Sequence, residues 1–135
     1  MSQVIIFKSE NGSVSVCFPT GEVPIETVLI KDCPPGAVIV EKSVLPEKDG
    51  DFFGAWEMQE DNTVIVNISK AREITKTRLR AERKPLLEAQ DVLFQRALET
   101  GAPTAEIVAE KQRLRDITLL ADSLNTTAEL RALKC

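Results

Sequence analysis

Residues 70–120 read KAREITKTRLRAERKPLLEAQDVLFQRALETGAPTAEIVAEKQRLRDITLL, and this stretch decides how the chain folds. Leu79, Leu86 and Leu93 stand seven residues apart, and most positions between them hold Arg, Lys, Glu or Gln. Residues separated by seven share one face of an α-helix, whereas charged and amide side chains favour helix and contact water. The spacing therefore predicts an amphipathic helix over about 70–99.

Two breaks divide the helical stretch. The sequence GAPT at 101–104 ends the first helix, because glycine closes a helix in the left-handed conformation and proline cannot continue it. Ser69 and Thr104 are the expected N-caps of the two helices, and the short connection makes the helices antiparallel neighbours. Pro85 lacks a backbone donor, so it predicts a kink or restart between a basic segment at 70–84 and an apolar segment at 85–99.

The apolar side chains of the two predicted helices are expected to pack as one seam. Burying a single Leu, Ile or Phe side chain contributes about 1.5–3 kcal/mol before entropy is counted. A hairpin of two short helices is nevertheless marginal in isolation, so it needs the rest of the chain or a partner. The expected seam sets Leu86, Leu87, Leu93, Phe94 and Leu98 against Ile107, Val108, Leu114 and Ile117.

The N-terminal half predicts a small β-rich unit. Short apolar runs at 4–7, 14–18, 38–40 and 63–68 are separated by turn-forming residues and predict strands. The apolar residues of 24–31 have helical spacing, and 48–51 is predicted to be a surface loop. A Thr-x-x-Glu capping box at Thr126 predicts a last helix over 127–133. The fold class is therefore α+β: a small, mostly antiparallel domain with one short helix over 1–68, then a helical hairpin and a short terminal helix over 69–135.

Composition argues against an enzyme. The chain has no His or Tyr, so it has no His-based triad or His-ligated metal site, and its six glycines form no phosphate-binding loop. Cys17, Cys33 and Cys135 are too few and too scattered for a disulfide framework, and no C-x-x-C motif occurs. The sequence predicts no catalytic residues, no bound metal and no cofactor.

The net charge of −4 hides an asymmetry. Residues 1–68 carry −7, whereas residues 69–135 carry +3. No apolar run approaches the ~18–20 residues of a membrane span, and the N-terminus lacks a basic leader with an apolar core. We therefore expect no membrane contact and a cytoplasmic site of synthesis.

The helical stretch resembles a known family. An R-x-x-R-x-x-L-L-x-x-x-D run followed by L-R-D-I is similar to the C-terminal helical module of small tail-assembly and tail-associated proteins of tailed bacteriophages. The resemblance covers about 74–120 and implies a tail-region protein, located in the virion or in the host cytoplasm during assembly. The residues that carry it are Arg80, Arg83, Leu86, Leu87, Asp91, Leu114, Arg115, Asp116 and Ile117.

The leading functional hypothesis is a non-enzymatic tail-region protein, either a minor virion component or an assembly factor. Its partner would be a tail, baseplate or fibre protein bound through the hairpin, and the apolar seam also allows a homo-oligomer. Trp56 is either an exposed anchor at an interface or a core residue. The alternative is a small nucleic-acid-binding regulator that uses the basic segment 70–84, a reading weakened by the acidic net charge and the lack of interleaved aromatics. The candidate partner-binding residues are Arg78, Arg80, Arg83, Leu86, Leu93, Arg115, Asp116 and Trp56.

Overall fold

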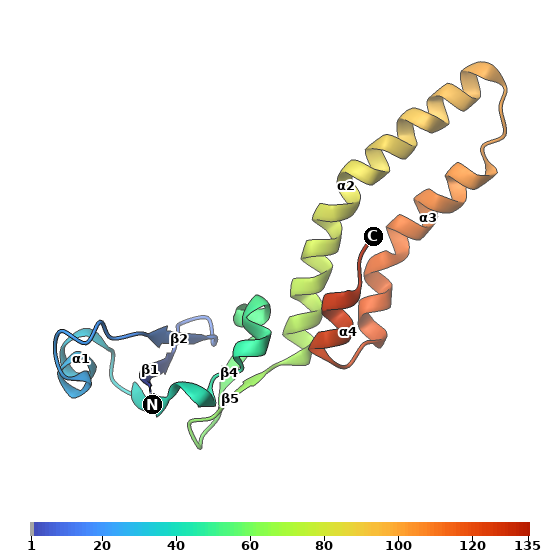
Figure 1. Ribbon diagram of the computed structural model, residues 1–135. Coiled ribbons are helices and arrows are strands. Elements are labelled where there is room, and N and C mark those ends of the chain that lie inside the picture. The colour runs from blue at the N-terminus through green and yellow to red at the C-terminus, as the bar shows by residue number, and fades with distance from the viewer. Residues whose placement is uncertain (1) are drawn as a thin grey trace. The chain divides into compact units, whose positions relative to one another are not determined.

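The computed structural model describes residues 2–135 and confirms the α+β class, with 58% helix and 15% strand. An N-terminal antiparallel sheet is followed by two long helices and a short terminal helix (Figure 1). The chain forms two compact units, Met1–Ala71 and Arg72–Cys135, here called unit 1 and unit 2.

Unit 1 contains two small antiparallel sheets. Strands β1 (Gln3–Lys8), β2 (Val14–Cys17) and β3 (Val38–Glu41) form the first in the order β2-β1-β3, and β4 (Trp56–Met58) pairs with β5 (Val64–Val66) in the second. The β1–β2 turn needs the positive φ of Gly12 (84°), a conformation that glycine adopts at little cost. Its neighbour Asn11 accepts a hydrogen bond from the Ser13 amide at 3.1 Å, which closes the turn.

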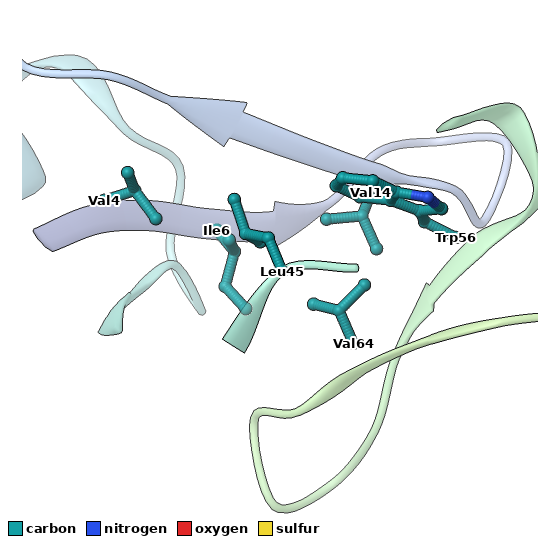
Figure 2. Close-up of a cluster of buried hydrophobic side chains, with 6 residues drawn as sticks. All are labelled: Val4, Ile6, Val14, Leu45, Trp56 and Val64. Carbon is teal, nitrogen blue, oxygen red and sulfur yellow. The ribbon is translucent and has the colours of Figure 1, made fainter. Parts of the chain in front are cut away.

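One face of the first sheet builds the core of unit 1. Val4 and Ile6 alternate with Ile5 along β1, so they project from the opposite face to Ile5. They pack with Val14, Leu45, Trp56 and Val64, which brings β4 and β5 against the first sheet (Figure 2). Helix α1 (Ile25–Asp32) contacts β1 and β3, and the fully buried Ile5 lies on the face left for it.

Some boundaries in unit 1 differ from those expected. The predicted loop at 48–51 lies within the 3₁₀ segment η2 (Glu47–Ala55), which follows η1 (Lys42–Val44) and has non-helical backbone angles at Asp49 and Phe52. The indole Nε1 of Trp56 donates to the Asp49 carbonyl at 3.1 Å and holds this segment against the core. Ile68 starts helix α2 instead of ending a strand, and Asn67 caps that helix in place of Ser69, since its side-chain oxygen accepts from the Lys70 amide at 3.1 Å.

Unit 2 is a helical hairpin closed by a short helix. Helix α2 (Ile68–Thr100) is followed by α3 (Ala105–Leu120), the short 3₁₀ segment η3 (Ala121–Ser123) and α4 (Thr127–Ala132). Gly101, at φ 71°, ends α2: its amide bonds to the Leu98 carbonyl and the Ala102 amide to the Ala97 carbonyl, which is the Schellman arrangement.

Helix α2 continues through Pro85, so of the expected kink or restart the chain makes no restart. Figure 1 shows a change of direction near the middle of the helix, where Pro85 lies. Pro85 and Ala81 are both exposed, so the Ala81 carbonyl that loses its helical donor remains accessible to water. Solvation of that carbonyl explains why one proline bends the helix but does not end it.

Helix α4 completes the core of unit 2. Leu79 of α2, Leu114 of α3 and Leu130 of α4 are all fully buried. Figure 1 shows α4 beside the first half of α2 and the second half of α3. As the sequence predicts, Thr126 caps α4: its hydroxyl oxygen accepts from the Glu129 amide at 3.1 Å.

Candidate protein-binding surface on the helical hairpin

The basic segment 70–84 is largely engaged inside the fold. Within unit 2, Arg72 donates from Nε to the Leu124 carbonyl at 2.9 Å and from Nη2 to Asn125 Oδ1 at 2.7 Å. Lys76 lies 2.6 Å from an Asp122 carboxylate oxygen, and this hydrogen bond raises the pKa of Lys76. These contacts hold the start of α2 to the segment after α3, so both cations have a structural role.

Arg78 is the centre of the contacts that hold α4 and the residues after it. Its Nη2 donates to the carbonyls of Leu130 (3.0 Å) and Leu133 (2.6 Å), and its Nη1 lies 2.6 Å from Glu82 Oε2. The hydrogen bond from Arg78 lowers the pKa of Glu82, although partial burial opposes the shift. The last carbonyls of a helix lack the usual donors four residues on; the Leu130 carbonyl also accepts from the Leu133 amide at 3.3 Å, and Arg78 supplies a further donor to it and one to the Leu133 carbonyl.

Arg83 joins α2 to α3 in a different way, because the carbonyls that it contacts lie inside α3 and not at its end. Its Nη1 donates to the Arg115 carbonyl at 2.8 Å and lies 3.4 Å from the Leu114 carbonyl. Arg80 and Lys84 are exposed, and within residues 2–135 no hydrogen bond or ion pair is seen for either. Of the cations at 70–84 in unit 2, these two remain available to an external ligand.

The distal hairpin, defined as residues 85–110, exposes Val92 and four apolar side chains that the expected seam would have buried. Leu87, Phe94 and Ile107 are half-buried and Ala97 is buried, so the seam closes partly here, whereas α4 supplies a third helical face in the other half of the hairpin. Two helices alone cover one side of each other and leave the remaining sides to solvent. The exposed fractions are 42% for Leu86, 50% for Val92, 45% for Leu93, 56% for Leu98 and 51% for Val108.

The three leucines spaced seven residues apart in α2 change from buried to exposed along the helix. Leu79 is fully buried, whereas Leu86 and Leu93 follow on the same helix face and are nearly half exposed. Cys135 lies at the point of change: its thiol donates to the Leu79 carbonyl (3.6 Å) and its amide to Glu82 Oε1 (3.4 Å). The helix face of Leu79 thus continues along α2 with no covering segment among residues 2–135.

The distal hairpin is acidic. Between residues 85 and 110 the chain has five acidic residues and one basic residue, Arg96. Lys111, just outside, lies 2.6 Å from Asp91 and 5.2 Å from the ring centroid of Phe94, so it holds α3 to α2. Glu88, Glu99 and Glu106 are exposed and give this end of the hairpin a negative surface.

The remaining candidate residues are spread over the molecule. Arg115 is exposed and contributes its carbonyl to Arg83, while Asp116 accepts from Gln112 Nε2 at 3.0 Å. Trp56 is 4% exposed and lies in the core of unit 1, 4.9 Å from Phe53 by ring centroids. Trp56 is therefore a core residue, which was the other alternative for it.

Sequence reasoning did not identify Val92, Leu98 and Val108 as exposed, because helical spacing cannot show where a third helix ends. It also missed the acidic distal hairpin, although a signal was present. The charge changes sign within the helical half, between the basic stretch 70–84 and the acidic stretch 85–110.

Comparisons of this chain with protein-family models, curated proteins and solved structures found no match. Within residues 2–135, no helix is both long enough and apolar enough to cross a membrane. The same residues contain no group of three or more Cys, Asp or Glu side chains placed to hold a metal ion. The site is thus defined by the surface of the distal hairpin itself.

Proposed function

We propose that this chain is a non-enzymatic protein of the tail region of a tailed bacteriophage, a minor virion component or an assembly factor. Its distal hairpin binds a tail, baseplate or fibre protein, in the virion or in the host cytoplasm during assembly. The phage assignment rests on the resemblance over 74–120. The docking role rests on one observation: Leu86 and Leu93 remain exposed on a helix face that is covered up to Leu79.

The chemistry of the surface specifies the partner segment. Leu86 and Leu93 continue the helix face on which Leu79 is buried, so an apolar peptide segment of the partner would extend apolar packing along that face. Glu88, Glu99 and Glu106 favour basic residues beside that apolar segment, because charges of opposite sign steer association. The expected partner segment is therefore amphipathic and basic.

The first test is mass spectrometry of gradient-purified virions together with capture from infected-cell lysate. A constant ratio to tail proteins in the virion would support a structural component. Capture of an identified tail, baseplate or fibre protein, with the chain absent from virions, would support an assembly factor. Absence from virions combined with capture of none of these proteins would overturn the proposal.

The docking surface has its own variant test. Leu86→Asp with Leu93→Asp should abolish capture, because each places a charge in an apolar contact. Leu119→Asp is the matched control: Leu119 is also an exposed leucine of unit 2 (63%), but it lies outside the distal hairpin. Equal capture by both variants would exclude Leu86 and Leu93 from the interface. A change from oligomer to monomer in the double variant would identify a second copy of this chain as the occupant.

Fewer cations are available for the alternative function, nucleic-acid binding, than the sequence suggests. It requires cations at 70–84, yet Arg72, Lys76, Arg78 and Arg83 contact groups of the protein itself. Reversing the charge of Arg78 or Arg83 would disturb the fold. The double variant Arg80→Glu with Lys84→Glu therefore tests nucleic-acid binding without removing these internal contacts. Steeply salt-dependent DNA binding that this variant abolishes would favour the alternative. Lack of binding at low salt would eliminate it.

A further inference from the structure

Strand β2 forms one edge of the first sheet in unit 1. The strand order is β2-β1-β3, so β2 pairs with β1 on one side and, among residues 2–135, with no strand on the other. An edge strand presents a row of unpaired backbone N–H and C=O groups to which another strand can add. Natural sheets commonly protect such edges with charged residues, with proline or with a covering segment. The two edges of this sheet differ in that protection.

The register of the β1–β2 ladder shows which backbone groups of β2 point away from β1. The Ser9 amide donates to the Ser13 carbonyl at 2.8 Å, so these two residues form a hydrogen-bonded pair. Bonded and non-bonded pairs alternate along an antiparallel ladder, and Val14 and Val16 fall at non-bonded positions. Their N–H and C=O groups therefore point outward, and within residues 2–135 no hydrogen bond is seen for these groups.

Strand β2 is uncharged and is followed by exposed apolar surface. Val14 is buried in the core of unit 1, and Val16 is half-buried and packs against that core. Phe18, which comes directly after the strand, is nevertheless 60% exposed. A strand added beside β2 with apolar side chains on the core face would extend the core and bury part of this surface.

Strand β3, the other edge of the sheet, is better protected. It ends in the charged Glu41, and the 3₁₀ segment η1 begins at the next residue. The Lys42 amide donates to the Ser2 carbonyl at 2.8 Å, which fixes the bonded positions of the β1–β3 ladder. By the same alternation, Ile39 and Glu41 have outward backbone groups. The β3 edge therefore offers similar backbone groups beside a charge, which makes it an internal control for β2.

Acidic side chains lie on both sides of β2 in the sequence. Glu10 is in the turn before the strand, Glu22 follows the strand, and both are exposed. Lys8 is the β1 residue opposite Val14, and residues 1–68 still carry −7 in total. A strand with basic ends would be attracted to this edge, whereas a second copy of the chain would bring like charges together. The charge therefore favours a basic partner segment over self-association.

We propose that the open edge of β2 binds an extended peptide segment of a partner protein, which adds to the sheet beside β2. The segment alternates apolar and polar residues and carries Lys or Arg at its ends. Its backbone bonds to the outward groups of Val14 and Val16, and its basic ends interact with Glu10 and Glu22. The site lies in unit 1 and is separate from the docking surface on the distal hairpin.

The test combines the full-length native protein with a short synthetic peptide that alternates valine and threonine and has lysine at both ends. Amide hydrogen exchange is followed by NMR with and without the peptide. The amides of Val14 and Val16 should exchange at least about tenfold more slowly with peptide bound, because they enter new hydrogen bonds. The amides of Ile39 and Glu41, on the protected edge, are the matched control and should exchange at unchanged rates.

Two altered peptides separate the backbone contribution from the charge contribution. Methylation of the peptide nitrogens that face β2 should abolish binding, because it removes the donors of the added ladder. Replacement of the lysines by glutamate should weaken binding by about tenfold or more. Glu10→Lys with Glu22→Lys should reverse this preference, and both positions are exposed, so the variant keeps the fold.

Four results would overturn the proposal. They are absence of protection at Val14 and Val16, equal protection along the β3 edge, undiminished binding of the methylated peptide, and a dimer in which Val14 and Val16 are protected before peptide is added. The last result would assign the β2 edge to a second copy of the chain. Leu86→Asp with Leu93→Asp should bind the peptide as wild type does, so this proposal and the distal-hairpin proposal can fail separately.

Discussion

The two halves of the helical hairpin use the same leucine heptad in different ways. In the proximal half, around Leu79, α4 and the residues after it cover the heptad face, and the basic side chains bond to the carbonyls of that covering segment. In the distal half, Leu86 and Leu93 repeat the spacing with no covering segment among residues 2–135. Heptad spacing therefore specifies a helix face, whereas a third element decides whether that face is core or surface.

The largest expected difference between the halves is in stability. Leu79→Ala should lower the free energy of unfolding of unit 2 by about 2–5 kcal/mol, because it leaves a cavity among Leu79, Leu114 and Leu130. Leu93→Ala should lower it by less than about 1 kcal/mol, because Leu93 is already 45% exposed. Urea unfolding followed by circular dichroism measures both variants. Equal losses would show that the distal heptad is packed as tightly as the proximal one.

A smaller difference is expected for two arginines of the same helix. Arg78→Ala should cost about 1–3 kcal/mol, because it leaves the carbonyls of Leu130 and Leu133 without this donor. Arg80→Ala, at an exposed position two residues later, should change stability by no more than about 0.5 kcal/mol.

Hydrogen exchange locates the effect of the Arg78 substitution. Amides of residues 127–135 should exchange faster in Arg78→Ala and remain unchanged in Arg80→Ala, because of these two arginines Arg78 is the one that bonds to this segment. Unchanged protection of α4 in Arg78→Ala would mean that apolar contacts of Leu130 alone hold this helix.

Much of this architecture follows from local signals in the sequence. The spacing of Leu79, Leu86 and Leu93, the glycine at 101 and the capping box at Thr126 each act within a few residues, so they predicted α2, its end and α4. The apolar run at 4–7, the alternation at 14–18 and the Asn11-Gly12 turn between them likewise predict the first hairpin. The fold class could be derived because these signals agree with one another.

Long-range placement could not be derived in the same way. Lysines and arginines at 70–84 resemble a solvated or ligand-binding face until the position of α4 is known, and Arg78 reaches carbonyls more than 50 residues away. These features arise from tertiary packing.

The smallest expected effect is a pH dependence of stability that arises in the proximal half, from the pair Arg78 and Glu82. The hydrogen bond from Arg78 lowers the folded-state pKa of Glu82, so the pair stabilises unit 2 above the ordinary glutamate pKa. This contribution is lost as the pH falls through the lowered value, where the carboxylate takes up a proton. Both side chains are 34% exposed, so solvent screening limits the contribution to about 0.5–1 kcal/mol.

Glu82→Gln should therefore be less stable than wild type at pH 7 by about this amount and equal to it near pH 3. In an Arg78→Gln background the same substitution should have little effect at either pH, because the charged partner is absent. Urea unfolding of the four proteins at both pH values gives the coupling energy directly. A Glu82→Gln penalty that persists at pH 3 would assign the role of Glu82 to its hydrogen bond with the Cys135 amide instead of its charge. The hydrogen bond between Glu82 and the backbone amide of Cys135 would then be the contact that matters beside the covered part of the heptad face. A partner segment that binds at Leu86 and Leu93 would have to make a similar backbone contact.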